Sequence, residues 1–545
     1  MSEQDASWDI EADVVVLGSG AAALVAALAA HHYGAGEVLV LEKSGMVGGT
    51  SAMSGGMLWV PLNHHELEAG IEDSIDDVVA YLDALAPGML DADTLSAFLE
   101  SGPEMVRFLA DHTPAQLRTF LGFPDYQPGI IGALPHGGRS LDNDVFPFED
   151  LGSAATRVNP PKTGVPKLLS RFEDKYGGVS DDELAERVRR DCRGQGQALV
   201  GSLFKGILDR GIPVLYETRA RTLCTDGGKV VGVVAEQERG TVRVRARKGV
   251  VIATGGFEWN ESLVKKFLRG PMTGPISVPE CEGDGLLMAM EVGASLGNMS
   301  NAWWMTSSKE SKAGHRDARP NFLACASERA FPGSILVNRQ GRRFVNEAMN
   351  YNALGFALHQ FDPAAYEWTN LPYWMVFDSR YMSNYRMFTS VAGEPAPSWA
   401  TRADTLRELA AKIGVDGDGL EATVERWNDL SQKGHDDDFG RGDSTWDHWV
   451  GDSSRPQPMS CLGEIDQPPY YAILMEAGVN GTCGGPVANA NAQVVDWNDR
   501  PIEGLYVCSN TMAAVTAGVY GGGGGTLGPG MTFGFIAGRH AATRS

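Results

Sequence analysis

Cysteine is scarce in this sequence, with seven in 545 residues, an odd number, and no two of them in C-x-x-C spacing. Such usage favours buried thiols in a reducing compartment over a disulfide scaffold or a zinc site. Residues 1–9 are polar and acidic and lack the basic start of a signal peptide, so we expect a cytoplasmic protein. Neither the adjacent pair His64 and His65 nor the lone His136 has metal-ligand spacing, and we expect no metal.

Basic residues are also in deficit, because 46 lysines and arginines stand against 69 aspartates and glutamates, which gives a formal net charge of −23. An acidic surface argues against nucleic acid or an anionic membrane as a partner. The most apolar stretch, residues 12–30, is interrupted by Asp13, Gly18, Ser19 and Gly20. It therefore predicts a buried strand followed by a buried helix, and no membrane span.

A glycine-rich turn stands between a predicted strand, residues 13–17, and a predicted alanine-rich helix, residues 21–32. A second strand is predicted over residues 37–41 and ends at Glu42. Strand, turn, helix and strand form the opening unit of a dinucleotide-binding domain. In that unit the turn and helix N-terminus hold the pyrophosphate, and the terminal acid bonds a ribose hydroxyl. The fingerprint is G-x-G-x-x-A, and its predicted cofactor contacts are Gly18, Gly20, Ala21, Ala22 and Glu42.

A second loop of small residues follows Glu42 and favours FAD over NAD. Such a loop suits a long cofactor whose ribityl chain and isoalloxazine ring run past the first strand. A further turn, after the apolar residues 250–252, is typical of the cofactor side of two-domain flavoproteins. No second dinucleotide fingerprint is visible, which argues against direct use of NAD(P)H. The contacts predicted in the two loops are Gly48, Gly49, Thr50, Ser51, Ser54, Gly55, Gly56, Ala253, Thr254 and Gly255.

The character of the chain changes after about residue 285, where tryptophans gather among prolines and polar loops. Two amphipathic helices are predicted between residues 404 and 432, and short strands and glycines return after residue 468. Before the change, strands are predicted at 214–223, 230–235, 242–246 and 249–253. We expect an α/β, two-domain flavoprotein, in which a Rossmann-like FAD-binding domain is interrupted by an α+β catalytic domain. The expected boundaries are 1–290 and 467–545 for the FAD-binding domain and 291–466 for the catalytic domain.

Four segments follow one another along the chain: EKSGMVGGTSAMSGGMLWVP (42–61), ATGGFEWN (253–260), GSILVNRQGRRFVNEAMNY (333–351) and GTCGGPVANANAQVV (481–495). Together they resemble the fumarate reductase/succinate dehydrogenase flavoprotein superfamily. Within that superfamily they are most similar to the 3-ketosteroid Δ1-dehydrogenases. The resemblance covers nearly the whole chain, with the motifs in the family's order.

Several departures from the superfamily pattern exclude a dicarboxylate substrate. Dicarboxylate reductases carry an arginine four residues after their Asn-Glu pair, where this chain has Tyr351, and a histidine where it has Gly481. The segment 521–526 also lacks their carboxylate-binding arginine. A dianion needs such charge-assisted bonds, so fumarate is a poor candidate. Gly49 stands in place of the histidine that tethers FAD in succinate dehydrogenase, which implies non-covalent FAD.

The resemblance to the ketosteroid dehydrogenases implies a mechanism built on tyrosines. Tyr520 and the backbone N–H of Gly524, in a run that resembles the family's Tyr-Pro-x-x-Gly-x-Thr-x-Gly-Pro, would hold the C3 carbonyl oxygen as an oxyanion hole does. Gly521 stands where proline is usual. Tyr351 would take the C2 proton while flavin N5 accepts hydride from C1, and Tyr126 would hydrogen-bond and help to ionise Tyr351. Unassisted, a tyrosine has a pKa of about 10.

The expected substrate is thus an apolar, steroid-like ketone, with a quinone or an artificial compound as electron acceptor. The same scaffold also permits a 3-ketosteroid Δ4-dehydrogenase or a cyclic enone reductase. A non-catalytic flavin electron-transfer protein is the alternative of another class, but it would need no paired tyrosines. The tryptophans could be core residues or a substrate cradle. The remaining expected cofactor contacts are Lys43, Ala220, Asp284, Asn510 and Leu527.

Overall fold

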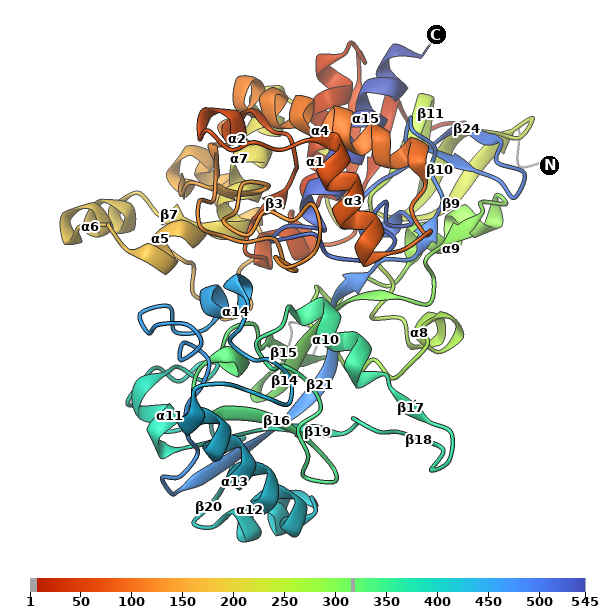
Figure 1. Ribbon diagram of the computed structural model, residues 1–545. Coiled ribbons are helices and arrows are strands. Elements are labelled where there is room, and N and C mark those ends of the chain that lie inside the picture. The colour runs from red at the N-terminus through yellow and green to blue at the C-terminus, as the bar shows by residue number, and fades with distance from the viewer. Residues whose placement is uncertain (1–6, 315–318, 545) are drawn as a thin grey trace.

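The computed structural model describes residues 7–314 and 319–544, and it contains two large sheets. In Figure 1 the N-terminal and C-terminal segments, red to yellow and dark blue, form the upper part of the molecule, and the green to light-blue middle of the chain forms the lower part. The two sheets therefore belong largely to different stretches of sequence. No helix among these residues is long and apolar enough to cross a membrane.

The upper part is built on an eight-stranded sheet with the order β23-β24-β11-β1-β2-β8, to which β10 and β9 are added at β11. β1 pairs in parallel with β2 and β11, and β11 pairs in parallel with β24. The strands are β1 (Ile10–Leu17), β2 (Val38–Leu41), β8 (Val214–Leu215), β9 (Arg219–Asp226), β10 (Lys229–Gln237), β11 (Gly240–Ile252), β23 (Gln493–Val495) and β24 (Pro501–Val507).

Helices cover this sheet, and two of them meet unusually closely. α1 (Ala21–His32) is buried along almost its whole length, and α15 (Leu527–Thr543) packs against it. A Cβ added at Gly534 would lie 2.3 Å from the Ala22 carbonyl oxygen. At Gly538 a Cβ would lie 2.2 Å from the Ala26 carbonyl oxygen. Only glycine allows two helix backbones to approach this closely, so the last helix of the chain is fastened to the first.

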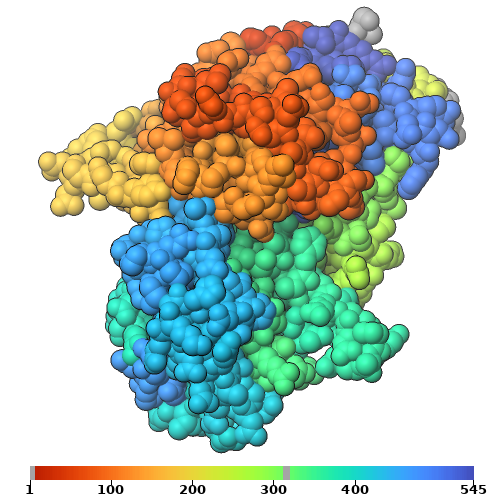
Figure 2. Space-filling model, viewed as in Figure 1, coloured from red at the N-terminus to blue at the C-terminus, as the bar shows by residue number. Residues whose placement is uncertain are grey.

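Other short elements surround the glycine loop that follows β2. The other helices of the upper part are α2 (His64–Glu68), α3 (Ile75–Leu85), α4 (Ala92–His112), α5 (Arg171–Tyr176), α6 (Asp181–Arg189), α7 (Gln195–Asp209) and α9 (Asp284–Glu291), and α8 (Glu261–Phe267) lies below α9 in Figure 1. The small strands are β3 (Leu58–Trp59), β4 (Leu117–Thr119), β5 (Ser140–Asn143), β6 (Phe146–Pro147), β7 (Cys192–Arg193), β13 (Leu296–Gly297) and β22 (Gly485–Pro486). The loop itself contains the 3-10 helix η2 (Gly49–Met53). In the space-filling view the yellow segment with α5 and α6 projects from the upper part, above light-blue residues (Figure 2).

The lower part holds a seven-stranded sheet with the order β15-β14-β21-β19-β16, with β12 and β20 both paired to β21. Its strands are β12 (Gly274–Pro275), β14 (Ala302–Gly314), β15 (Pro320–Ala324), β16 (Ser334–Asn338), β19 (Tyr373–Asp378), β20 (Thr401–Ala403) and β21 (Tyr470–Thr482). The hairpin strands are β17 (Phe361–Asp362) and β18 (Glu367–Trp368). The helices are α10 (Tyr351–Leu358), α11 (Ser379–Asn384), α12 (Leu406–Ile413), α13 (Gly417–Lys433) and α14 (Thr445–Val450).

The predicted opening unit is confirmed, since β1, α1 and β2 fall on the expected residues, and α12 and α13 are the two predicted amphipathic helices. Two strand predictions were wrong. The predicted strand 214–223 is interrupted, because Glu217 adopts a φ of 51° between β8 and β9. The two strands predicted around Ala246 and Gly249 are one continuous strand, β11, whose pairing with β1 shifts in register between Ala12 and Val14. We retain the domain boundaries as a proposal, although β21, which follows residue 466, lies in the lower sheet.

Candidate active site

A cavity of ≈ 560 Å³ lies where the two parts of the molecule meet. Its walls come from the end of β1, the glycine loop after β2, the strands β14 and β15, the start of α10 and the loop before α15. The four catalytic candidates Tyr126, Tyr351, Tyr520 and Gly524 all line it. So do the sequence-predicted cofactor contacts Gly18, Gly20, Ala21, Ala22, Glu42, Lys43, Gly49, Thr50, Ser51, Ser54, Gly55, Gly56, Ala220, Ala253, Thr254, Gly255, Asp284, Asn510 and Leu527.

Gly48 is the one predicted contact that does not line the cavity. Its N–H donates to the Ser19 carbonyl at 3.0 Å, and a Cβ here would lie 2.8 Å from Val200 Cγ1. The residue is therefore needed for a close turn against the α7 side of the loop.

The end of the cavity at α1 has the shape and the donors that a dinucleotide pyrophosphate requires. Gly18 has a φ of 101°, and a Cβ there would lie 2.4 Å from the Ala253 carbonyl oxygen, so the turn accepts only glycine. Gly20 precedes the first turn of α1 without a side-chain cap, and the Ala21 N–H donates to Ser51 Oγ at 3.2 Å. A helix N-terminus of this kind is a ready anion site.

The sequence-predicted cofactor contacts that line the cavity form a cradle for the dinucleotide, and acidic and basic side chains after β2 belong to it. Glu42 is 8 % exposed and accepts from Ser19 Oγ at 2.5 Å and from the Ser44 N–H at 2.8 Å. Burial raises the pKa of Glu42. Lys43 Nζ is paired with Asp284 at 2.8 Å and with Glu282 at 3.0 Å, so the expected contacts Lys43 and Asp284 bond to one another across the cavity wall.

The three tyrosines predicted to be catalytic come from distant segments and meet at the other end of the cavity. The hydroxyl oxygens of Tyr126 and Tyr351 are 2.8 Å apart, and either one can donate. The ring of Tyr520 lies 5.4 Å from that of Tyr351 and 5.7 Å from that of Tyr126, measured between centroids. Tyr351 is the first residue of α10, capped by the side chain of Asn350.

A buried hydrogen-bond bridge fastens the Tyr126 segment to the glycine loop before α15. The Gly521 carbonyl accepts from the Tyr126 N–H at 3.0 Å and from the Tyr81 hydroxyl at 2.8 Å. The Tyr81 hydroxyl accepts in turn from the Gln127 N–H at 3.1 Å. These contacts fix one catalytic candidate relative to the loop that carries two others.

Asp125 secures the same segment from the other side. Its carboxylate accepts from Trp59 Nε1 at 3.0 Å and from Arg139 at 2.8 Å, and Arg139 is itself paired with Asp73. The Trp59 ring in turn lies where a Cβ added at Gly521 would be, so the loop needs glycine there.

The Asn-Glu pair before Tyr351 positions the aromatic wall of the cavity. Glu347 is fully buried and paired with Arg343 at 2.8 Å and Arg441 at 3.1 Å. Asn346 donates to Asp447 on α14 at 2.8 Å, and the Ala348 carbonyl accepts from the indole of Trp446 at 3.0 Å. α14 therefore presents Trp446 and Trp449 to the cavity beside Tyr126 and Phe123, with ring centroids 4.4 Å and 4.3 Å apart.

Burial dominates the electrostatics of the tyrosines. It raises the pKa of Tyr126, Tyr351 and Tyr520 well above 10. The positive charge of Arg171, which also lines the cavity, opposes that rise at Tyr126 and Tyr351. All three hydroxyls are protonated at neutral pH, so a tyrosine base here requires assistance.

The backbone around Gly524 is arranged to present a free donor. Gly524 has a φ of 97°, and its carbonyl accepts from the N–H groups of Trp59 at 3.1 Å and Gly528 at 2.9 Å. Its own N–H has no hydrogen-bond partner within residues 7–314 and 319–544, and the residue borders the cavity. A Cβ would lie 2.4 Å from the Met57 carbonyl oxygen, so no other residue fits without moving the loop.

Comparison with known proteins connects this geometry to a family. The family model described as "FAD binding domain" matches residues 13–527. The chain is 40% identical over 540 residues to the 4-oxocyclohexanecarboxylate 2-dehydrogenase of Sinomonas cyclohexanicum, covering 97% of this chain and 92% of the relative. It is 36% identical over 570 residues to the 3-oxosteroid 1-dehydrogenase of Mycobacterium tuberculosis, covering 98% of this chain and 99% of the relative. The chain belongs to the 3-ketosteroid Δ1-dehydrogenase family of FAD-binding proteins.

Solved structures agree with this assignment. The crystal structure of the 3-ketosteroid Δ1-dehydrogenase from Sterolibacterium denitrificans in complex with 1,4-androstadiene-3,17-dione superimposes with a TM-score of 0.90 at 35% identity, covering 98% of this chain and 99% of that one. The open form of a flavocytochrome c3 fumarate reductase, at 24% identity and a TM-score of 0.66, shares the fold. This family member is accordingly an FAD-dependent oxidoreductase with the two-domain flavoprotein fold, as the sequence predicted.

Some cavity residues of this dehydrogenase-family chain escaped sequence reasoning. Ser19 occupies a variable position of the fingerprint, yet its buried hydroxyl bonds Glu42. Arg171 has no recognisable motif around it. Trp446 and Trp449 line the cavity, and Trp446 is at the same time a buried core residue, whereas Trp427 is fully buried in the core of the lower part. The spacing of Trp446 and Trp449 by three residues on one helical turn was the available signal.

Proposed function

We propose that this chain desaturates a 3-ketosteroid between C1 and C2, with Tyr351 as base and with Tyr520 and Gly524 as the carbonyl-binding pair. The observation that carries the proposal is the meeting of three buried tyrosines, two with hydroxyls 2.8 Å apart, in the cavity that also contains the dinucleotide cradle. Removal of a proton beside a carbonyl requires an oxyanion site and a base within reach of one another.

The carbonyl-binding pair supplies the first requirement. The N–H of Gly524, which has no partner among the described residues, and the hydroxyl of Tyr520 both border the cavity. The Tyr520 hydroxyl donates to Thr526 Oγ1 at a long 3.4 Å and also interacts with Tyr351 and Asn480. Two such donors stabilise the enolate character that develops as the neighbouring C–H is broken. A single donor of this kind contributes about 100- to 1000-fold to turnover in other enzymes.

Tyr351 supplies the base, and its surroundings make the required phenolate less costly. Burial raises its pKa, and so does Tyr126 when Tyr351 is the donor between the two hydroxyls, while a hydrogen bond with Tyr520 and the cation of Arg171 act in the opposite direction. Tyr126 can donate to the Tyr351 oxygen at 2.8 Å and so stabilise its ionised form. The position of Tyr351 at the N-terminus of α10 adds a favourable dipole.

The cradle residues would hold FAD without a covalent bond, and bound FAD supplies the hydride acceptor. The N-terminus of α15, at Leu527, borders the same cavity and presents its positive end there. We further propose that a quinone or an artificial compound takes up the electrons, and that the protein acts in the cytoplasm.

The aromatic wall favours a flat, apolar substrate. Phe123, Trp446 and Trp449 line the cavity in a cluster of rings that includes Tyr126, and Phe388 also lines the cavity. Rings of this size exclude water and stack against fused carbocycles, which is what a steroid offers.

One observation favours a second candidate, a ring ketone that carries a carboxylate. The relative from Sinomonas cyclohexanicum is named for 4-oxocyclohexanecarboxylate. Arg171 lines the cavity with a guanidinium that is paired with Asp174 only loosely, at 3.6 Å. Arginine matches a carboxylate in geometry and charge, so it could anchor such a substrate.

The decisive experiment is to mix the FAD-loaded protein anaerobically with 4-androstene-3,17-dione or with 4-oxocyclohexanecarboxylate, and to record flavin bleaching and products. We expect bleaching by the steroid, with a 1,4-diene as product. A 4,5-desaturated product from a saturated ketosteroid would instead indicate Δ4 chemistry. Preference for the keto acid, lost in Arg171→Gln, would establish the second candidate. A flavin that stays oxidised with both ketones would refute the proposal.

A further inference from the structure

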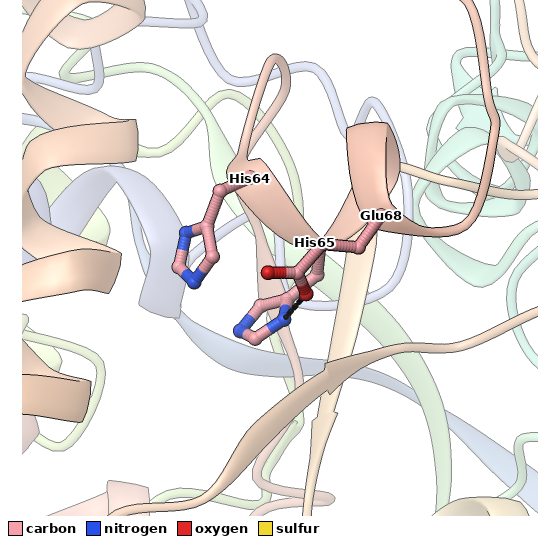
Figure 3. Close-up of side chains that lie close together, drawn as sticks. All are labelled: His64, His65 and Glu68. Carbon is pink, nitrogen blue, oxygen red and sulfur yellow. Dashed lines mark hydrogen bonds and ion pairs between the residues drawn. The ribbon is translucent and has the colours of Figure 1, made fainter.

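A second constellation of chemically active side chains lies outside the active-site cavity, on the short helix α2. His64, His65 and Glu68 each offer one ligand atom, and these three atoms lie within 4.8 Å of one another. None of the three lines the active-site cavity. Figure 3 shows the two imidazole rings and the Glu68 carboxylate converging on one side of the helix.

Some of the side chains in this group are already in contact with one another. His65 Nδ1 is 3.1 Å from Glu68 Oε2, and the two imidazole centroids are 4.0 Å apart with an interplanar angle of 36°. His64 Nδ1 and His65 Nε2 are buried atoms with no hydrogen-bond partner among the described residues. Buried imidazole nitrogens are normally satisfied, so both rings have unused bonding capacity, although the unpartnered nitrogen of His65 is not the one that faces Glu68.

The backbone that carries the group is held in place independently of it. The side chain of Asn63 caps α2 by accepting from the N–H groups of His65 and Glu66, and it donates to the Val60 carbonyl at 2.8 Å. The Glu66 carboxylate accepts from Asn63 Nδ2 at 2.8 Å and from the Leu62 N–H at 3.0 Å. Asn63 and Glu66 are almost fully buried, so the helix presents His64, His65 and Glu68 from a fixed frame.

We propose that His64, His65 and Glu68 bind a divalent transition-metal cation of the zinc class. Two imidazoles and one carboxylate suit Zn²⁺, Ni²⁺ or Cu²⁺, whereas Mg²⁺ and Ca²⁺ prefer oxygen ligands alone. Tetrahedral zinc places its ligand atoms about 3.3 Å apart, so small rotations of these side chains would close the group around an ion. The exposed carboxylate of Glu68 leaves the fourth position open to water.

The proposal departs from the expectation of no metal, which rested on sequence spacing alone. Adjacent histidines on a regular helix point about 100° apart, and spacing arguments therefore discount them. Here the helix has only five residues, its N-cap Asn63 follows Leu62, which has a φ of 63°, and the two rings lie beside each other. All three ligands belong to α2, so a bound ion would brace this short helix itself.

The test uses the FAD-loaded protein after treatment with a chelator and desalting. Equilibrium dialysis against ZnCl₂, with metal measured by mass spectrometry, should give one equivalent of zinc per chain, and millimolar Mg²⁺ should not displace it. Zinc should also raise the midpoint of thermal unfolding. Glu68→Gln, at an exposed side chain, should weaken zinc binding at least 10-fold, and His65→Gln should abolish it, both with unchanged FAD content.

His435→Gln is the matched control, because His435 is an exposed histidine that also lies beside carboxylates, 3.6 Å from Asp437 and 3.5 Å from Asp443. Its zinc stoichiometry should equal that of the unmodified chain. If no zinc is retained, or if Glu68→Gln and His65→Gln bind as much zinc as the control does, the proposed site is refuted.

Discussion

The bridge made by Tyr81 gives the sharpest test of how the active site is assembled. Replacing Tyr81 with phenylalanine keeps the buried ring and removes only the hydroxyl that joins the Gly521 carbonyl to the Gln127 N–H. The Gly521 carbonyl keeps its bond from the Tyr126 N–H, but the Gln127 N–H loses its partner. Tyr81 does not line the cavity, so any effect on catalysis must pass through the position of Tyr126 and the glycine loop.

The expected magnitudes follow from these contacts. One buried N–H without a partner costs about 1–3 kcal/mol of stability. One of the two bonds that hold the Gly521 carbonyl is also lost, so the Tyr126 hydroxyl and the Gly524 N–H become less well aligned. Because misplacement by about 1 Å can cost up to about 100-fold in rate, we expect kcat to fall by about 10-fold. KM should change little, since the aromatic wall is untouched.

The assay is steady-state turnover of the ketosteroid as a function of pH, together with FAD content and thermal unfolding. In Tyr81→Phe the rise of kcat with pH should move to higher pH, because Tyr126 supports the Tyr351 phenolate less well. Tyr373→Phe is the control, because it removes a hydroxyl that donates to the Glu476 carbonyl at 3.1 Å from an equally buried ring outside the cavity. If both variants lose stability and neither loses kcat, Tyr81 does not position the catalytic groups.

Three further outcomes are expected. Tyr351→Phe should abolish turnover with FAD content unchanged, and near-normal turnover of this variant would exclude Tyr351 as the base. In the unmodified chain kcat should rise with pH, because the buried base must ionise. Gly524→Ala should lower kcat by about 100-fold or more, because the added Cβ would clash with the Met57 carbonyl and move the Gly524 N–H, the proposed oxyanion donor. Gly518→Ala is the control: this residue is equally strained, at a φ of 84°, but lies outside the cavity, so the change should affect mainly stability. Burial raises the pKa of Glu66 from 4.5 to about 8, so its contribution to stability is complete below pH 4.5 and is lost as the pH rises towards 8. Glu66→Gln should flatten the dependence of stability on pH, which roughly amounts to a few kcal/mol. An unchanged pH dependence of thermal unfolding would contradict this prediction.

The cofactor cradle could be predicted from sequence because its determinants are local. The strand, turn and helix around Gly18 lie within a short stretch, and each supports the same interpretation. Glu42 was identified by its place at the end of the next strand. Gly48 shows the limit of this reasoning, since two neighbouring glycines in one loop serve different purposes: Gly49 borders the cavity, while Gly48 fits a turn against Val200.

The three candidate catalytic tyrosines could be proposed only through the family resemblance. No local pattern relates Tyr126, Tyr351 and Tyr520, which three separate elements bring together. Arg171 was missed for the same reason, because its proximity to the tyrosines depends on how α5 packs against the rest of the molecule. The break at Glu217 was missed because β-branched and apolar residues on both sides of it continue the strand pattern.

The close contact between α1 and α15 has a consequence for how the chain folds as it is made. β1 and α1 are synthesised first, yet β24, the glycine loop and α15, which complete the sheet and the cavity, come from the last stretch of residues. The lower sheet can form while those residues are still inside the ribosome, whereas the apolar surface of α1 must wait for Gly534 and Gly538. Flavin uptake is therefore expected to follow the synthesis of α15, and chaperone dependence should be greatest before that helix has docked on α1.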